Sequence, residues 1–210
     1  MSEDLVFYTN PMSRGAIVRW MLEEVGAPYD VEVVEYGEPM KSDAYLAVNP
    51  MGKVPAIRHG DLVVTECAAI CTYLADAFPE AGLAPPPADR GRYYRWLFFA
   101  AGPLEAATTN RMLGFEATAE QEQMAGYGKL DTVIDVLETA LAGGGHVAGE
   151  RFSAADVYVG SHVHWGMDTM QTIDRRPAFV DYWERLSGRQ ARRRAEALDA
   201  ALMPQDAAGA

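Results

Sequence analysis

The chain has 210 residues, of which 49% are hydrophobic, and this is enough to fill one large core or two smaller ones. Its formal net charge of −12 argues against the phosphate backbone of a nucleic acid or an anionic membrane surface as the main partner. Because no stretch reaches the roughly 20 apolar residues that span a bilayer, and because the cysteines Cys67 and Cys71 are not a disulfide framework, we expect a globular protein of the reducing cytoplasm.

The N-terminal segment has the pattern of a strand, a helix and a second strand. Residues 5–8 predict a short buried strand, which a polar turn containing a proline ends. Apolar residues then recur at helical spacing up to Gly26, and Ser13 is the expected N-cap. Residues 29–36 alternate between apolar and charged side chains. We therefore expect a parallel pair of strands joined by a crossover helix.

A hairpin and a third helix follow, and then a linker. The hairpin is expected to turn at residues 59–61, and the helix to cover residues 67–78. The stretch "PEAGLAPPPAD" contains four prolines and is the clearest linker in the chain. Beyond it the patterns are helical, over residues 90–113, 120–142, 154–168 and 178–202. The expected organisation is an α/β domain over residues 1–78, a linker over 79–88, an all-helical domain over 89–203 and a flexible tail over 204–210.

Four motifs resemble those of the cytosolic glutathione transferases, in the order "YTNPMSRG", "NPMGKVPA", "TECAAI" and "FSAADV". The resemblance covers nearly the whole chain and is greatest to bacterial, theta-like enzymes of the serine type. It implies a thioredoxin-like N-terminal domain that binds glutathione, an all-helical domain that supplies most of the electrophile pocket, and a homodimer. It also implies glutathione as the cosubstrate and no metal ion. His162 and His164 do not suggest a metal site, because residues two apart on a helix point in different directions.

A glutathione transferase has to lower the pKa of a thiol from about 8.5. By the resemblance, Ser13 stands where theta-type enzymes carry a catalytic serine, whose hydroxyl would donate to the thiolate. Tyr8 stands where alpha-, mu- and pi-like enzymes carry a catalytic tyrosine, and Arg14 matches an arginine that supports the thiolate. Asn10, or the backbone alone, is a third alternative, and capping the helix would by itself explain Ser13. Neither residue 13 nor residue 14 is a cysteine, which argues against mixed-disulfide chemistry.

The resemblance assigns "NPMGKVPA" to the peptide backbone of glutathione. Pro55 is expected to follow a cis peptide bond just before the third strand. This geometry would turn the N–H and C=O of Val54 toward the cysteinyl part of glutathione, to which they would bind as a neighbouring strand does. Lys53 is then placed to meet the glycyl carboxylate, the alternative being an ordinary exposed lysine in a turn.

"TECAAI" resembles the family's turn that binds the γ-glutamyl end of glutathione. Glu66 would accept a hydrogen bond from the ammonium group, and the backbone N–H of Cys67 would hold the α-carboxylate at the start of a helix. The family usually has serine at position 67, so a contact from the Cys67 side chain stays open. Glu66 could instead only favour the helix N-terminus electrostatically. In "FSAADV", Ser153 and Asp156 form a capping-box pattern with a folding role.

The implied activity is conjugation of the glutathione thiolate to a hydrophobic electrophile, by positioning and electrostatic stabilisation. Candidates for the electrophile pocket are Met12, Met112, Phe115 and Trp165, although methionines and aromatic residues on helices more often belong to a core. Other glutathione-dependent reactions, such as isomerisation, dehalogenation or ether cleavage, use the same thiolate. A non-catalytic binding module of the same fold is the remaining alternative.

Overall fold

The structure is a computed structural model in which residues 4–203 are described, so the predicted tail over residues 204–210 lies outside the described residues. The described chain forms two compact units. The first consists of residues 4–83 together with 189–203, and the second of Ala84–Gly188. Among the described helices, none is long and apolar enough to cross a bilayer.

The first unit is built on a four-stranded mixed sheet with the strand order β2-β1-β3-β4. Its strands are β1 (Leu5–Thr9), β2 (Asp30–Val33), β3 (Ala56–His59) and β4 (Leu62–Thr65). β1 runs parallel to β2 and antiparallel to β3, and β3 and β4 form an antiparallel hairpin. The predicted parallel pair and the predicted hairpin are therefore confirmed. β1 is buried along its whole length and lies in the centre of the unit.

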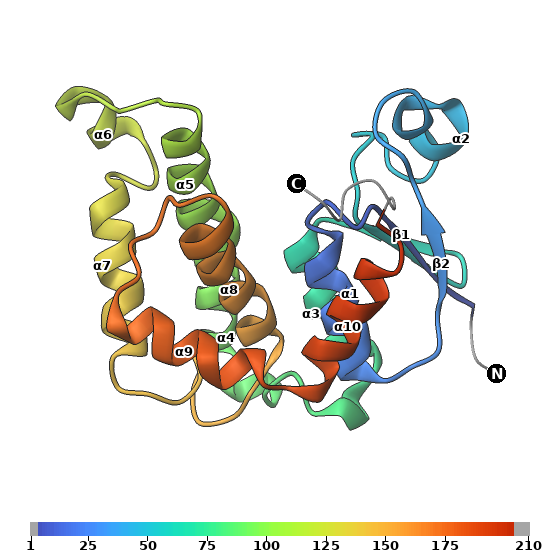
Figure 1. The fold of residues 1–210 in the computed structure, drawn as a ribbon. Helices are drawn as coiled ribbons and strands as arrows, with labels where there is room; N and C mark the ends of the chain where they lie inside the picture. The colour runs from blue at the N-terminus through green and yellow to red at the C-terminus, as the bar shows by residue number, and fades with distance from the viewer. Residues whose placement is uncertain (1–3, 204–210) are drawn as a thin grey trace. The chain divides into compact units, whose positions relative to one another are not determined.

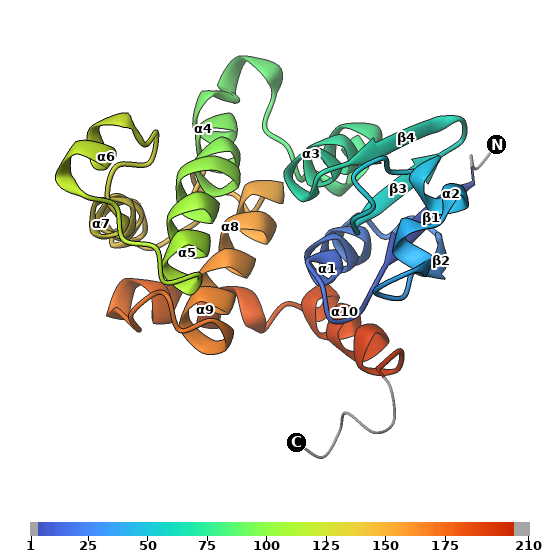
Figure 2. The same ribbon diagram turned by 90° about the horizontal axis from the view of Figure 1, so that it is seen from above.

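Helices cover both faces of this sheet (Figure 2). They are α1 (Gly15–Val25), α2 (Asp43–Leu46) and α3 (Cys67–Ala77), with short 3-10 helices η1 (Pro39–Lys41) and η2 (Pro79–Ala81) in the connections. α1 and α3 pack against each other, and the Arg19 guanidinium of α1 lies 5.0 Å from the ring centre of Phe7. On the other face, Tyr8 shares a hydrophobic cluster with Tyr45 of α2. Neighbouring residues of β1 thus face different helices, as the alternation of a strand requires.

The C-terminal helix α10 (Gln190–Ala200) belongs to the first unit and lies along α1 (Figure 1). The sequence-based boundaries placed this helix in the helical domain, whereas the structure groups it with the first unit. Charged side chains of α1 and of the C-terminal segment pair with each other there. Arg19 of α1 is only 2% exposed, and its Nε donates a hydrogen bond to Asp199 Oδ1 at 3.0 Å. Two exposed or half-buried pairs join the same segments, Glu23 with Arg194 and Glu24 with Arg189. Docking of α10 supplies the partner that the buried arginine needs.

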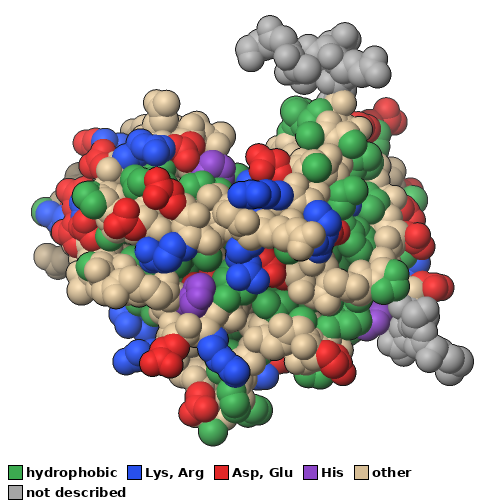
Figure 3. All heavy atoms as spheres, turned by 60° about the horizontal axis from the view of Figure 1, so that its bottom comes forward, with side chains coloured by type: hydrophobic (Ala, Val, Ile, Leu, Met, Phe, Trp, Pro, Cys, Tyr) green, Lys and Arg blue, Asp and Glu red, His purple; other side chains and the backbone are tan. Residues whose placement is uncertain are grey.

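Three arginines of the basic run over residues 189–197 form ion pairs within the first unit. Besides the two pairs with α1, Arg192 lies 3.3 Å from Glu196 one turn further along α10. On the face shown in Figure 3, Lys and Arg side chains lie among Asp and Glu side chains instead of forming one continuous basic area.

The second unit consists of helices and turns, with one isolated β-bridge between His146 and Gly149 among its described residues. Its helical segments are η3 (Pro87–Asp89), α4 (Gly91–Phe99), η4 (Ala100–Leu104), α5 (Glu105–Met112), α6 (Ala119–Met124), α7 (Leu130–Leu141), α8 (Ala154–His164), η5 (Trp165–Thr169) and α9 (Pro177–Ser187), of which η4 and η5 are π-helical. The all-helical prediction is confirmed. Two predicted helices are shorter than expected, because one is interrupted between α6 and α7, and the other between α9 and α10 at Gly188.

The predicted capping box at the start of α8 is confirmed. Ser153 is the N-cap, and its backbone N–H and hydroxyl both donate to Asp156 Oδ2, at 2.9 and 3.1 Å. Asp156 Oδ1 accepts hydrogen bonds from the N–H of Val147 and the hydroxyl of Tyr182. Burial, together with this carboxylate, raises the pKa of Tyr182 above its ordinary value. Asp156 therefore ties α8 to α9 and belongs to the framework of the helical unit.

Candidate functional site

Ser13 lies in the turn between β1 and α1. The structure makes Arg14 the N-cap and Gly15 the first residue of α1, so the prediction of Ser13 as N-cap is wrong by one residue. The Ser13 hydroxyl donates to the carbonyl of Asn10 at 2.7 Å and accepts from the N–H of Gly15 at 2.9 Å. The second bond satisfies the N–H of the first residue of α1, as a capping side chain does. The hydroxyl is thus held at the N-terminus of α1.

Asn10 supports the same turn from inside the protein. Its side chain is buried, with Nδ2 donating to the carbonyl of Val34 at 3.2 Å and Oδ1 accepting from the N–H of Met12 at 3.0 Å. Both ends of the amide are engaged with the chain itself. Asn10 therefore fixes the shape of the loop that carries Ser13 and links it to the end of β2.

Tyr8 points into the core beneath α2. It is 7% exposed and packs in one cluster with Tyr45, Val34 and Met40. The neighbouring Tyr8 hydroxyl raises the pKa of Arg58 on β3 above its ordinary value. Tyr8 therefore lies on the side of the sheet opposite to Phe7 and α1. The Ser13 hydroxyl, in contrast, lies at the start of α1.

The N-termini of α1 and α3 lie next to each other. The thiol of Cys67, the first residue of α3, donates to the backbone carbonyl of Arg14 at 3.5 Å. Helix N-termini carry partial positive charge, so the two together favour bound anions. The geometry brings together three predicted site residues from distant parts of the sequence, Ser13, Arg14 and Cys67.

Glu66 occupies a backbone conformation that is rare for a residue with a side chain. Its φ is 69° and its ψ is 119°, immediately before α3, and its side chain is exposed. Such a conformation costs about 1–3 kcal/mol, and residues of this kind cluster at binding sites. The positive φ therefore marks Glu66 as a candidate binding residue.

The loop "NPMGKVPA" has the predicted backbone geometry, since the Val54–Pro55 bond is cis. The carbonyl of Lys53 accepts two hydrogen bonds of 2.7 Å, from the Tyr45 hydroxyl and from Asn49 Nδ2. Neither the N–H nor the C=O of Val54 is hydrogen-bonded within residues 4–203. The backbone of Val54 is thus held in place by its neighbours while its own polar groups are available. The Lys53 side chain is exposed.

Two residues that sequence reasoning missed hold this loop. Lys41 Nζ donates to the carbonyls of Met51 and Gly52, at 3.1 and 2.8 Å. A side chain at Gly52 would meet Lys41 Nζ at 2.7 Å, and its φ of 56° also favours glycine. Asn49, besides its bond to Lys53, accepts from the N–H of Met51. Asn49 could have been noticed as a turn-forming residue before Pro50, whereas nothing local identifies Lys41.

The four predicted electrophile-pocket residues are not gathered within one unit. Met12 belongs to the first unit, and Met112, Phe115 and Trp165 to the second. Met12, Met112 and Phe115 are 56%, 53% and 46% exposed, as suits residues that contact a ligand or solvent. Their shared role stays a prediction.

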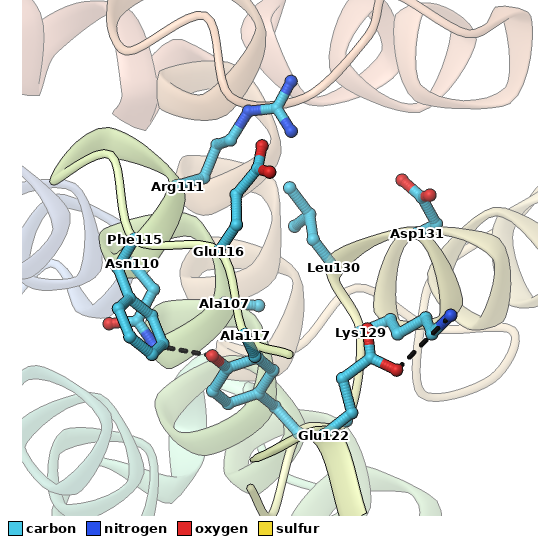
Figure 4. A pocket seen from close by; sticks show the side chains of 12 residues that line it. Ala107, Asn110, Arg111, Phe115, Glu116, Ala117, Glu122, Lys129, Leu130 and Asp131 are labelled. Atoms are coloured by element: carbon cyan, nitrogen blue, oxygen red, sulfur yellow. Dashed lines mark hydrogen bonds and ion pairs between the residues drawn. The ribbon is translucent and has the colours of Figure 1, made fainter. Parts of the chain in front are cut away.

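Phe115 lines a hollow of about 250 Å³ in the helical unit. Arg111 and Glu116 lie close together on one side of it, and Asp131 lies on another (Figure 4). Its wall also contains the ion pair of Lys129 with Glu122 at 3.3 Å. This charged lining does not match the apolar pocket expected for a hydrophobic electrophile, and neither Met112 nor Trp165 takes part in it.

Comparisons with known proteins agree with this architecture. The family model of the glutathione S-transferase N-terminal domain matches residues 13–77, and that of the C-terminal domain matches residues 94–190. Glutathione S-transferase 3 of Zea mays is 30% identical over 206 residues, which cover 89% of this chain and 90% of that protein. A glutathione transferase structure from Methylococcus capsulatus has a TM-score of 0.77 and 30% identity, covering 94% of this chain and 99% of that one. A glutathione transferase homologue from Sulfitobacter, with bound glutathione, has a TM-score of 0.76 and 26% identity, with 97% and 100% covered. The chain therefore belongs to the glutathione S-transferase family.

Proposed function

We propose that this enzyme binds glutathione on its first unit, stabilises the thiolate at the N-terminus of α1, and conjugates it to a hydrophobic electrophile. The observation that carries the proposal is the meeting of two helix N-termini, joined by the bond from the Cys67 thiol to the Arg14 carbonyl. A tripeptide with two carboxylates and a thiolate is the kind of anion that such a place favours.

Each predicted binding residue has a role that its surroundings support. The unbonded N–H and C=O of Val54 would pair with the cysteinyl backbone of glutathione. The exposed Glu66 carboxylate would accept from the ammonium group, and the Cys67 N–H would hold the α-carboxylate. The exposed Lys53 would meet the glycyl carboxylate. Because the Cys67 thiol already donates to Arg14, we expect its contribution to glutathione to come from the backbone.

Ser13 is the preferred thiolate donor, with Tyr8 as the alternative. The Ser13 hydroxyl has a single proton, which is donated to the Asn10 carbonyl in the structure. To stabilise a thiolate, the hydroxyl has to turn its proton away from that carbonyl, while the N–H of Gly15 continues to donate to its oxygen. The burial of Tyr8 beneath α2 favours Ser13 over Tyr8.

A titration of the thiol of bound glutathione, followed by thiolate absorbance, tests this mechanism. We expect Ser13→Ala to raise the pKa of the bound thiol by about one unit or more, and Tyr8→Phe to leave it nearly unchanged. A shift in Tyr8→Phe with none in Ser13→Ala would transfer the role to Tyr8. Binding of glutathione without any fall in the thiol pKa would indicate a non-catalytic binding module.

The cellular setting and the assembly follow from the same proposal. Within the described residues both cysteines are buried and neither forms a disulfide, which suits a reducing cytoplasm. We expect a homodimer, as the family resemblance implies, and light scattering of the purified protein measures the mass of the assembly directly. Profiling with alkyl halides, aryl ethers and isomerisable substrates separates conjugation from the other reactions of a glutathione thiolate.

A further inference from the structure

The hydroxyl of Thr9 is buried and has no hydrogen-bond partner among the described residues. Thr9 is the last residue of β1 and is 0% exposed. Its backbone carbonyl is satisfied, because it accepts from the N–H of Val34 at 2.7 Å. A buried hydroxyl without a partner has lost its hydrogen bonds to water with no replacement, whereas valine has the same shape and carries no such cost. The presence of an unsatisfied hydroxyl at this position calls for an explanation.

This hydroxyl lies beside the Ser13 hydroxyl. A Cβ added to Gly15 would be 2.0 Å from Thr9 Oγ1 and 3.0 Å from Ser13 Oγ. The two oxygens therefore flank the same point, the place where any residue other than glycine would put its side chain. Gly15 keeps this place open, so no side chain separates Thr9 from Ser13.

The hydrogen bonds of Ser13 leave room for one more donor. A serine oxygen has two acceptor lone pairs and one proton. One lone pair accepts from the Gly15 N–H, and the proton goes to the Asn10 carbonyl. When the proton turns to a thiolate, the second lone pair stays unfilled. Thr9 carries a hydroxyl proton that has no other acceptor within the described chain.

We propose that Thr9 is a positioning residue that donates its hydroxyl proton in a hydrogen bond to Ser13 Oγ when Ser13 donates to the glutathione thiolate. This proposal rests on the proposed role of Ser13. A change of rotamer at either residue closes the gap between the two oxygens, and no proton is transferred. The chain of two hydroxyls polarises the Ser13 O–H, and such cooperativity strengthens a hydrogen bond by about 10–30%.

The test is the thiol titration of bound glutathione in Thr9→Val and Thr9→Ser, with Thr72→Val as the matched control. Thr72 lies on α3 of the same unit, and its hydroxyl donates to the carbonyl of Ala68, away from the site. We expect Thr9→Val to raise the pKa of the bound thiol by about 0.3–0.5 units, a two- to threefold loss of thiolate at pH values below that pKa. Thr9→Ser should restore the titration of the original protein, and Thr72→Val should not change it.

A double variant shows whether Thr9 acts through Ser13. In a Ser13→Ala background, Thr9→Val is expected to cause no further shift, because the acceptor oxygen is gone. An unchanged pKa of the bound thiol in Thr9→Val, together with higher resistance to urea, would overturn the proposal. It would show that the Thr9 hydroxyl is buried at a cost to stability and does not support Ser13. If Ser13→Ala shifts the pKa while Thr9→Val does not, only the role of Thr9 fails. If Ser13→Ala itself leaves the pKa unchanged, the proposed thiolate donor fails and the role of Thr9 fails with it.

Discussion

Arg19 and Asp199 form a buried ion pair between segments 180 residues apart in the sequence, with Arg19 Nε donating to Asp199 Oδ1 at 3.0 Å. The two side chains are only 2% and 12% exposed. Burial raises the pKa of Asp199 above its ordinary value even though Arg19 opposes the rise. The pair therefore depends on the docking of α10 against α1, and the candidate thiolate site lies at the N-terminus of the same helix α1.

Asp199→Ala is expected to lower the free energy of unfolding by about 3–5 kcal/mol, because it leaves a buried arginine without its carboxylate. Urea denaturation measures the change. Glu196→Ala is the matched control on the same helix, since its pair with Arg192 is solvent-exposed and should contribute less than about 1 kcal/mol. Equal losses in the two variants would contradict a special role of the Arg19 pair.

The raised pKa of Tyr45 predicts that the protein loses stability at alkaline pH. Burial, together with the neighbouring Tyr8, raises the pKa of Tyr45 from 10.0 to about 12. As the pH rises above 10.0, the unfolded chain loses this proton before the folded protein does, so stability that is complete below pH 10.0 is lost as the pH rises toward about 12. Urea midpoints at about pH 9 and about pH 11 should therefore differ less in Tyr45→Phe than in the original protein. The removed bond to Lys53 lowers both midpoints alike, so an unchanged difference would speak against the prediction.

Gly15→Ala is expected to destabilise the first unit by about 1–3 kcal/mol, as overpacking of a tight contact does. The new methyl group would lie 2.0 Å from Thr9 Oγ1, so that either the threonine or the start of α1 has to move. Gly91→Ala is the matched control, because Gly91 is also the first residue of a helix and a Cβ there meets nothing within 4 Å. Thermal unfolding should show a lower midpoint for Gly15→Ala alone. Similar midpoints in both variants would show that the Thr9 contact is loose.

The strained backbone of Glu66 predicts that its replacement by glycine increases the stability of the fold and weakens the binding of glutathione. Glu66→Gly relieves the positive φ of 69° and is expected to raise the free energy of unfolding by about 1 kcal/mol. The same change removes a charge-assisted contact to the ammonium group and should raise the KM for glutathione about tenfold. Glu66→Gln keeps the strained backbone, so it should raise the KM without the gain in stability. An unchanged KM in both variants would leave Glu66 only an electrostatic role at the start of α3.

Local patterns in the sequence were sufficient for most of the fold. The strand, helix and strand before residue 36, the hairpin turning near Gly60 and the helix after Glu66 depend on side-chain periodicity and turn residues that lie close together in the chain. The capping box of Ser153 and Asp156 is local for the same reason. The cis bond before Pro55 was predicted from the resemblance of its motif, not from periodicity.

The tertiary structure decided what depends on partners far away in the sequence. The docking of α10 brings Asp199 to the buried Arg19, which lies 180 residues earlier in the chain. No local sequence pattern near either residue predicts this pair. The Ser13 hydroxyl links the turn to the helix start, since it donates to the Asn10 carbonyl and accepts from the N–H of Gly15, the first residue of α1. The motif in the sequence, through its resemblance to the family, named Ser13, Tyr8 and Asn10 or the backbone alone as candidates for stabilising the thiolate. Only the tertiary structure shows that Tyr8 packs beneath α2, on the face of the sheet opposite to α1, because neighbouring side chains of a strand point to opposite faces; this packing favours Ser13 over Tyr8.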